Sequence, residues 1–336
     1  MTLNRRQTLA LMGATAASAL AAPALAGGHA KIKVGALSFT SHAGNFIAKE
    51  RGYFDEAGLD VEFEFFQAAQ PMAVAIASGD VDYALTAISG GLISLAQKGA
   101  IKVIGGGLSE EEGINGQVFL ASDAAFQAGV KTCADLGGKR FAVTQAGSSF
   151  HYMGAKMAAA EGIELEYTPL QKVGAIIGAM KSGQVDGWSI VPHIAKPLAG
   201  SGAVHIIGNV SDYLPDYQVT TVFTSATNAA DEAEKTRNFL SAYSKGVDDY
   251  AAAMIDKTAD EGAMVELIHK YVYTDRPLDK AAPSIIAGTM RLNKNAALNL
   301  ASVRDQLEWF QSEGLVDSDI TIEQLVDTSY VEVIGA

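Results

Sequence analysis

Two loops in this chain combine hydroxyl side chains with one histidine, and each runs into a helical pattern. Free backbone N–H groups at a helix N-terminus, beside Ser and Thr hydroxyls, can hold an oxyanion without a cationic side chain. The loops therefore predict a site for an anionic or strongly polar group, although Ser148 and Ser149 could also serve only as helix caps. The candidate ligand-binding residues are Ser38, Phe39, Thr40, Ser41 and His42 in the first loop, and Gly147, Ser148, Ser149 and His151 in the second.

Two further loops supply the remaining candidates. Thr86 and Ser89 follow a predicted strand, and Trp188 and His193 hold the matching place later in the chain. In a cleft, Trp188 would offer a flat stacking surface for a planar or apolar ligand body, whereas the alternative is a buried core tryptophan. Gln70 is a weaker polar candidate at the start of a helix.

Motifs for catalysis and metal binding are missing from the sequence. It contains no His-Glu-x-x-His, no Gly-x-Ser-x-Gly and no P-loop. Cys133 is the only cysteine, which excludes an internal disulfide and a cysteine-rich metal site. We therefore expect no catalytic residue, no metal and no cofactor. A periplasmic enzyme of similar shape and a ligand-sensing module for a membrane receptor remain as alternatives to a transport protein.

Strand-like and helix-like segments alternate along the first two thirds of the chain, which predicts an α/β fold with open, mainly parallel sheets flanked by helices. In the first part the order is strand, helix, strand, helix, strand, helix, strand. The predicted strands are 31–37, 59–66, 82–85 and 101–104, and the helices between them end near 54, 78 and 98.

The same order recurs about 104 residues later. Ser78-Gly79-Asp80-Val81-Asp82 matches Ser182-Gly183-Gln184-Val185-Asp186, and weaker matches precede it at the same offset. Gly79 and Gly183 stand where a helix must turn into a strand, a position that favours a left-handed residue. The constant offset predicts two lobes of like topology, with a ligand cleft between them at the carboxyl ends of the strands.

Helical patterns dominate from residue 229 to 314, interrupted at 274–277 and 282–283, and these helices are expected to pack on the first lobe. We expect the first lobe at 27–119, the second at 120–221, and a return to the first lobe with C-terminal helices at 222–336. Gly105–Gly107 and the acidic run Glu110–Glu112 are expected to form a mobile, solvated loop near one link.

Charge argues against a nucleic-acid partner. The 336 residues carry 25 Lys and Arg against 38 Asp and Glu, a net charge of −13. A chain with this charge does not concentrate polyphosphate around itself, and it is not attracted to an anionic membrane surface. The apolar fraction of 49% excludes a disordered chain.

The N-terminus has the pattern of an export signal. Arg5 and Arg6 precede an Ala- and Leu-rich stretch that is too short to span a bilayer comfortably, and Ala24-Leu25-Ala26 is a small-x-small cleavage site. The arginine pair favours the twin-arginine route, with an ordinary Sec signal as the alternative. We expect removal of residues 1–26 and a periplasmic location.

Several segments resemble one known family in the same order along the chain. Residues 47–62, Ala77–Asp82, 134–152 and Val185–Trp188 resemble motifs of periplasmic substrate-binding proteins that serve ABC importers for nitrate, sulfonate, taurine and thiamine-pyrimidine ligands. The resemblance covers nearly the whole chain after residue 26. The cysteine cluster of the pyrimidine-synthesising relatives is absent, and no arginines cluster in the matched loops.

The resemblance implies a two-lobed type II periplasmic-binding fold whose matched loops contact a solute and whose lobes close by a hinge. It implies a membrane permease and an ATPase as partners, and we expect the chain itself to be a monomer. The missing arginine cluster disfavours a small inorganic anion such as nitrate. An organic sulfonate or carboxylate with an apolar body, or a pyrimidine-like solute, fits the loops better.

Overall fold

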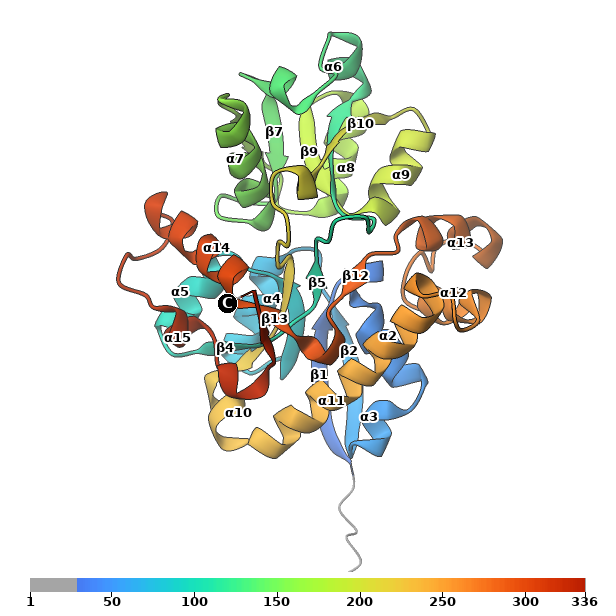
Figure 1. The fold of residues 1–336 in the computed structure, drawn as a ribbon, viewed down its shortest axis with the longest axis vertical. Helices are drawn as coiled ribbons and strands as arrows, with labels where there is room; N and C mark the ends of the chain where they lie inside the picture. The colour runs from blue at the N-terminus through green and yellow to red at the C-terminus, as the bar shows by residue number, and fades with distance from the viewer. Residues whose placement is uncertain (1–28, 336) are drawn as a thin grey trace, which may run out of the picture.

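Two five-stranded sheets form the centres of two lobes in the computed structural model, which describes residues 29–335 (Figure 1). The first sheet has the order β2-β1-β3-β11-β4 and the second the order β8-β7-β9-β6-β10. The strands of the first sheet are β1 (Ala30–Ala36), β2 (Leu59–Phe65), β3 (Tyr83–Ala87), β4 (Ile101–Gly106) and β11 (Thr220–Ser225). Those of the second are β6 (Val118–Ser122), β7 (Arg140–Val143), β8 (Glu166–Pro169), β9 (Gly187–Ile190) and β10 (Val204–Asn209).

Both sheets are mainly parallel, with one antiparallel strand in the fourth position. β11 runs antiparallel to β3 and β4, and β6 runs antiparallel to β9 and β10. Helices cover the faces of each sheet, as strand-crossover connections require. The predicted α/β fold is confirmed.

Helices connect the strands within each lobe. In the first lobe these are η1 (Thr40–His42), α2 (Ala43–Glu50), α3 (Tyr53–Glu56), α4 (Ala69–Ser78) and α5 (Gly90–Gln97). In the second they are α6 (Asp123–Gln127), η2 (Cys133–Leu136), α7 (Ser149–Glu161), α8 (Val173–Ser182), α9 (Pro192–Gly200) and η3 (Val210–Asp212).

The 104-residue repeat is present in the structure. Helices α4 and α8 start and end 104 residues apart, and so do the first residues of β3 and β9. Gly79 and Gly183 both adopt left-handed conformations, with φ of 81° and 70°, at the C-caps of α4 and α8. The two halves therefore repeat one strand and helix order, as the sequence predicts.

The chain crosses between the sheets twice. It leaves the first sheet after Gly106 and enters the second at Val118, and it leaves the second after Asn209 and returns at Thr220. The expected boundaries at 119/120 and 221/222 fall inside β6 and β11. Each crossing ends in a buried strand of the other sheet, β6 or β11. The amino-acid composition therefore does not mark the residue at which the chain passes from one lobe to the other.

The first crossing differs from the expected solvated loop. Gly105 and Gly106 belong to β4, and a Cβ atom at Gly106 would lie 2.0 Å from the carbonyl oxygen of Ala297. Glu110 is only 2% exposed, and the backbone N–H of Gln117 donates to its Oε1 at 3.0 Å. The crossing is therefore a packed segment, and the carboxyl group of Glu110 in the acidic run 110–112 is buried.

The C-terminal third is mostly helical and covers more than the first lobe. Helix α11 packs against α2, where a Cβ atom at Gly246 would lie 2.1 Å from the carbonyl oxygen of Gly44. Helix α13 packs against α9 of the second lobe. The elements are α10 (Ala226–Asp231), α11 (Ala233–Tyr250), the π-helical turn η4 (Ala251–Ile255), α12 (Glu261–His269), α13 (Leu278–Ala287), η5 (Lys294–Ala296), α14 (Leu300–Ser312), α15 (Ile322–Leu325) and η6 (Thr328–Tyr330).

Short pairings complete the tail. Strands β5 (Leu108–Ser109) and β12 (Arg291–Leu292) pair antiparallel, and β13 (Leu298–Asn299) pairs with β14 (Val333–Ile334). The expected break at 282–283 was wrong, because Pro283 lies inside α13. Pro283 is the sixth residue of α13, so it forgoes the backbone hydrogen bond to the carbonyl of Asp279, and the helix continues around it with Ala281, Ser284 and Ile285 buried.

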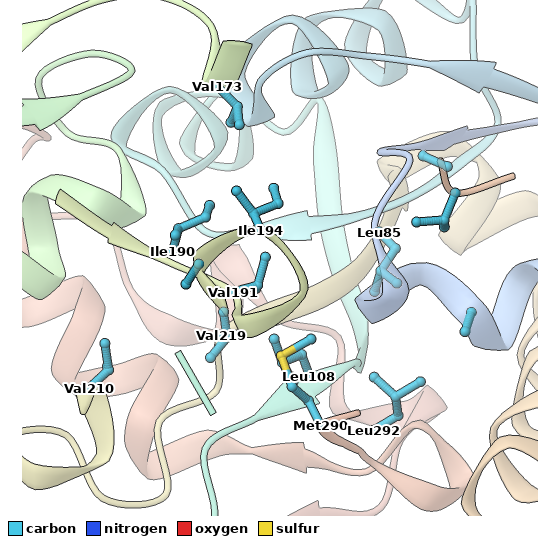
Figure 2. Close-up of a cluster of buried hydrophobic side chains, with 14 of the residues drawn as sticks. Leu85, Leu108, Val173, Ile190, Val191, Ile194, Val210, Val219, Met290 and Leu292 are labelled. Atoms are coloured by element: carbon cyan, nitrogen blue, oxygen red, sulfur yellow. The ribbon is translucent and has the colours of Figure 1, made fainter. Parts of the chain in front are cut away.

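A single buried apolar cluster runs through both lobes. Leu85 and Met290 belong to it, together with Leu108 and Val219 of the crossing segments and Ile190 of β9 (Figure 2). The two lobes are thus in close contact. Within residues 29–335 no helix combines the length and apolar character needed to cross a membrane. The expected export signal at 1–26 lies outside the described residues.

Candidate ligand-binding site

A cavity lies between the lobes at the carboxyl ends of β1, β3, β7 and β9. Its volume is about 60 Å³. This exceeds the roughly 10–15 Å³ that a cavity needs to hold one water molecule, so the cavity can take a small polar group. Open α/β sheets bind their ligands at this end of the strands. We call this space the inner cavity.

The lining of the inner cavity is apolar with scattered hydroxyl groups. No Lys, Arg, Asp or Glu is among the described residues that line it. Polar contacts can come from Ser, Thr, one glutamine and one imidazole. The lining residues are Leu37, Phe39, Ser41, His42, Ala68, Ala69, Thr86, Ala87, Leu108, Gln117, Thr144, Ser148, Ser149, Phe150, Val173, Ile190, Val191, Val219 and Thr220.

Besides α2, which continues directly from the 3₁₀ turn η1, four helices begin at the inner cavity. The lining includes the N-cap or first residue of α4, α7, α8 and α9: Ala69, Ser148, Val173 and Val191. The first N–H groups of a helix lack partners within the helix, and its dipole places partial positive charge at this end. The cavity is therefore electrically suited to a negatively charged group although no cationic side chain lines it.

Ser148 combines the two roles that the sequence left open. It is the N-cap of α7, where its hydroxyl oxygen accepts from the backbone N–H of His151 at 3.4 Å. It also lines the cavity together with Ser149. A serine hydroxyl that accepts from the helix still has its own proton to donate. Capping and ligand contact are thus compatible at this position.

His42 is a neutral polar group in the lining. It is fully buried, and burial lowers the pKa of its imidazole to about 3. Its Nδ1 accepts from the backbone N–H of Leu37 at 3.4 Å, which leaves the proton on Nε2. Among the described residues, that Nε2 has no hydrogen-bond partner. The Nε2–H group of His42 is therefore a buried donor that can bind a ligand in the cavity.

The structure divides the predicted residues into three groups. Phe39, Ser41, His42, Thr86, Ser148 and Ser149 line the inner cavity. Ser38 and His193 line a larger space outside it, which Phe39 also borders. Thr40, Gln70, Ser89, Gly147, His151 and Trp188 line neither space.

Most residues of the third group support the lining from behind. Trp188 is fully buried in β9, and its ring meets that of Phe150 edge-on, with centroids 5.7 Å apart. Ser89 caps α5 and contacts Gln70. The N–H of Gly147 donates to Nδ1 of His151 at 3.1 Å. Of the two hypotheses for Trp188, a stacking surface in the cleft and a buried core residue, its position agrees with the second.

Sequence reasoning missed the contribution of the crossing segments. Leu108 and Gln117 come from the first crossing, and Val219 and Thr220 from the second. The Thr220 hydroxyl accepts from the backbone N–H of Leu108 at 2.7 Å, which ties the crossings together behind the cavity. This contribution could have been predicted, because a segment that links two lobes must run along the floor of the cleft between them. The links were expected too late in the sequence.

The described residues offer neither a cluster that could hold a metal ion nor a reactive thiol. Within residues 29–335 no group of three or more His, Cys, Asp or Glu side chains is placed to hold a metal ion. Cys133 is buried in the second lobe, and burial raises the pKa of its thiol to about 11. A thiol with a raised pKa is a poor nucleophile.

Comparison with known proteins places this arrangement in a family. A family model described as NMT1/THI5 like matches residues 39–253, which hold the whole second sheet, the first sheet apart from β1, and the N-termini of α4, α7, α8 and α9. The chain belongs to the NMT1/THI5-like family. The resemblance to importer-binding proteins that the sequence motifs indicate is in accord with this membership, because solved sulfonate- and nitrate-binding proteins share its fold.

Individual relatives of this NMT1/THI5-like protein are distant in sequence. A Brucella abortus protein named only as a binding protein is 25% identical over 237 residues, 68% of this chain and 67% of the relative. The ligand-binding component of an ABC-type import system from Staphylococcus aureus has a TM-score of 0.71 at 16% identity, covering 91% of this chain and 100% of that one. The alkanesulfonate-binding protein SsuA from Xanthomonas axonopodis pv. citri, bound to MOPS, has a TM-score of 0.68 at 16% identity, covering 91% and 99%.

Proposed function

We propose that this NMT1/THI5-like protein is the periplasmic solute-binding component of an ABC importer. It captures a short organic anion, a carboxylate or sulfonate, between its lobes and delivers it to a membrane permease. The observation that carries the proposal is the inner cavity, which both lobes line and at which four helices begin. The names of the structural neighbours, an import-system component and an alkanesulfonate-binding protein, agree with it.

The cavity favours a singly charged organic anion over the other solutes considered. Helix N-termini stabilise one negative charge by fixed dipoles, and Ser149 and His42 add donors. The apolar remainder of the lining, with Phe150 on one side, suits a hydrocarbon body. An inorganic anion such as nitrate would leave this apolar surface uncovered. A pyrimidine-like solute would fill it without using the helix dipoles.

Isothermal titration calorimetry on the mature protein, residues 27–336, tests the ligand class after denaturation and refolding to remove bound solutes. Butyrate and ethanesulfonate are compared with nitrate, cytosine and 1-butanol, which lacks the charge. We expect 1:1 binding of the organic anions and none of 1-butanol. At about 1,000 times the dissociation constant, a ligand adds roughly 4 kcal/mol to unfolding, so Tm should also rise.

Three other results separate the proposal from its alternatives. Equal binding of butyrate and 1-butanol would contradict a site built on helix dipoles. Chemical change of a bound solute, followed by chromatography after incubation, would favour an enzyme. Loss of solute uptake on deletion of the gene, with uptake restored by the wild-type chain, distinguishes transport from sensing. A reporter fused to residues 1–26 tests export separately.

A further inference from the structure

A second space lies directly outside the inner cavity and is much larger. Its volume is about 710 Å³, and Lys181, Asp275 and Arg276 are among its lining residues. It is therefore a charged, solvent-facing vestibule, in contrast to the uncharged inner cavity. Leu37, Phe39 and Val173 line both spaces, so these three side chains form the partition between them.

Phe39 is the largest side chain of this partition, and the second lobe holds it in place. Its ring meets the imidazole of His193 in α9 edge-on, with centroids 5.0 Å apart. The ring also meets His42 edge-on, with centroids 6.4 Å apart. Phe39 of the first lobe thus packs against His193 of the second lobe.

A hydrogen-bond chain fixes the same contact. The Thr40 hydroxyl donates to the carbonyl oxygen of Gly288 at 3.1 Å, so it accepts from His193 Nδ1, which lies 3.1 Å away. Burial lowers the pKa of His193 to about 3, which keeps the ring neutral. Tyr273 donates its hydroxyl to the carbonyl oxygen of His193. Residues of the first lobe, the second lobe and the tail therefore converge beside Phe39.

We propose that Phe39 is the residue that limits ligand length in this protein, by separating the inner cavity from the vestibule when the lobes close. The inference rests on the proposed function. Opening of the lobes removes His193 from the ring, so a solute can pass Phe39 and then be shut in behind it. The inner cavity, at about 60 Å³, is far smaller than the vestibule, at about 710 Å³, which restricts anions bound behind Phe39 to short chains. Thr40 is a positioning residue that seats Phe39 through His193.

Two homologous series test the proposal by calorimetry: carboxylates from acetate to octanoate, and sulfonates from methanesulfonate to hexanesulfonate. The wild-type protein is expected to bind the short members of each series, such as butyrate and ethanesulfonate, and to lose at least tenfold in affinity towards octanoate and hexanesulfonate. Phe39→Ala joins the two spaces, so its optimum is expected to shift by two or more methylene groups. Phe39→Leu keeps most of the bulk and should shift the optimum less.

Matched variants separate this role from a general loss of packing. Phe66→Ala removes the same ring from the vestibule wall alone and should leave the optimum unchanged. Thr40→Val keeps the shape of the side chain but breaks the contact with His193, so it should broaden the range of chain lengths. An unchanged optimum in Phe39→Ala overturns the proposal while the proposed function stands. Binding of no member of either series by any variant overturns both.

Discussion

Lys156 of α7 and Asp305 of α14 form an ion pair of 2.7 Å between the second lobe and the tail. The same carboxylate accepts the hydroxyl proton of Tyr152, which is buried. Helix α14 also packs with the core of the first lobe through Phe310. The pair therefore joins elements that the proposed hinge motion would separate.

Removal of this pair should weaken ligand binding by favouring the open form. Both side chains are partly exposed, at 28% and 48%, so the pair contributes only about 0.2–1 kcal/mol. We expect Lys156→Met, which leaves the bond between Tyr152 and Asp305 in place, to lower affinity for the bound anion about 1.5- to 5-fold, with a smaller loss at high salt. Glu56→Ala is the control, because its 2.9 Å partner Lys245 lies on the same lobe. Equal losses in both variants would contradict a role in closure.

Ser148 and Ser122 are matched helix caps, and only Ser148 lines the cavity. Each hydroxyl accepts from a backbone N–H of its helix, at 3.4 Å and 3.2 Å. Substitution of either by Ala should cost about 1 kcal/mol of unfolding free energy, measured in urea. Ser148→Ala alone should also reduce ligand affinity by tenfold or more, since a hydrogen bond to a charged group is lost. Unchanged affinity would remove this hydroxyl from the site.

Trp188 should behave as a core residue. Its side chain is fully buried, and its indole Nε1 has no hydrogen-bond partner among the described residues. Trp188→Ala should lower the free energy of unfolding by about 3–5 kcal/mol. Trp188→Phe loses no hydrogen bond and should cost less. Retention of full stability with lost ligand binding in Trp188→Ala would instead place the ring in the site.

Glu110 should make stability depend on pH. Burial raises the pKa of its carboxyl from 4.5 to about 7, and the buried Tyr217 hydroxyl of the second crossing adds no positive charge nearby. Because the folded state holds the proton more tightly, the unfolded state releases it first as pH rises. The stabilisation is complete below about pH 4.5 and is lost as pH rises to about 7.

Glu110→Gln removes the titrating group and should flatten this slope. The difference in unfolding free energy between pH 4.5 and pH 8 should shrink by up to about 3 kcal/mol. Urea unfolding at several pH values measures it. An identical slope in the variant would show that other groups carry the dependence.

Gln218 joins the second crossing to the tail. Its side-chain NH₂ donates to the carbonyl oxygen of Thr220 at 2.8 Å, and its Oε1 accepts from the N–H of Asn299 at 2.9 Å. Gln218→Met should cost about 2–4 kcal/mol, because buried polar partners lose their bonds. Gln97→Met, at an exposed hydrogen bond, should cost under about 0.5 kcal/mol. Comparable losses would contradict a special role for this crossing.

Much of the fold could be predicted because its signals are local. The strand and helix patterns, and glycines such as Gly79 and Gly183, report the conformation of a few neighbouring residues. The lobe boundaries were placed less well, since β6 and β11 are buried strands that look alike whichever sheet they join. Pro283 was misread because local propensity disfavours proline inside a helix, whereas the buried side chains of α13 keep the helix continuous through it.

The sequence by itself determined the two-lobed α/β fold, its internal repeat and the loops that face the cleft, since periodicity and turn chemistry act over short distances. Only the tertiary structure decided that Trp188 stands behind Phe150, that Glu110 is buried, and that Phe39 meets His193 across the lobes. These contacts join residues far apart in the chain. Their energies depend on packing and burial, which the sequence order of polar and apolar residues does not record.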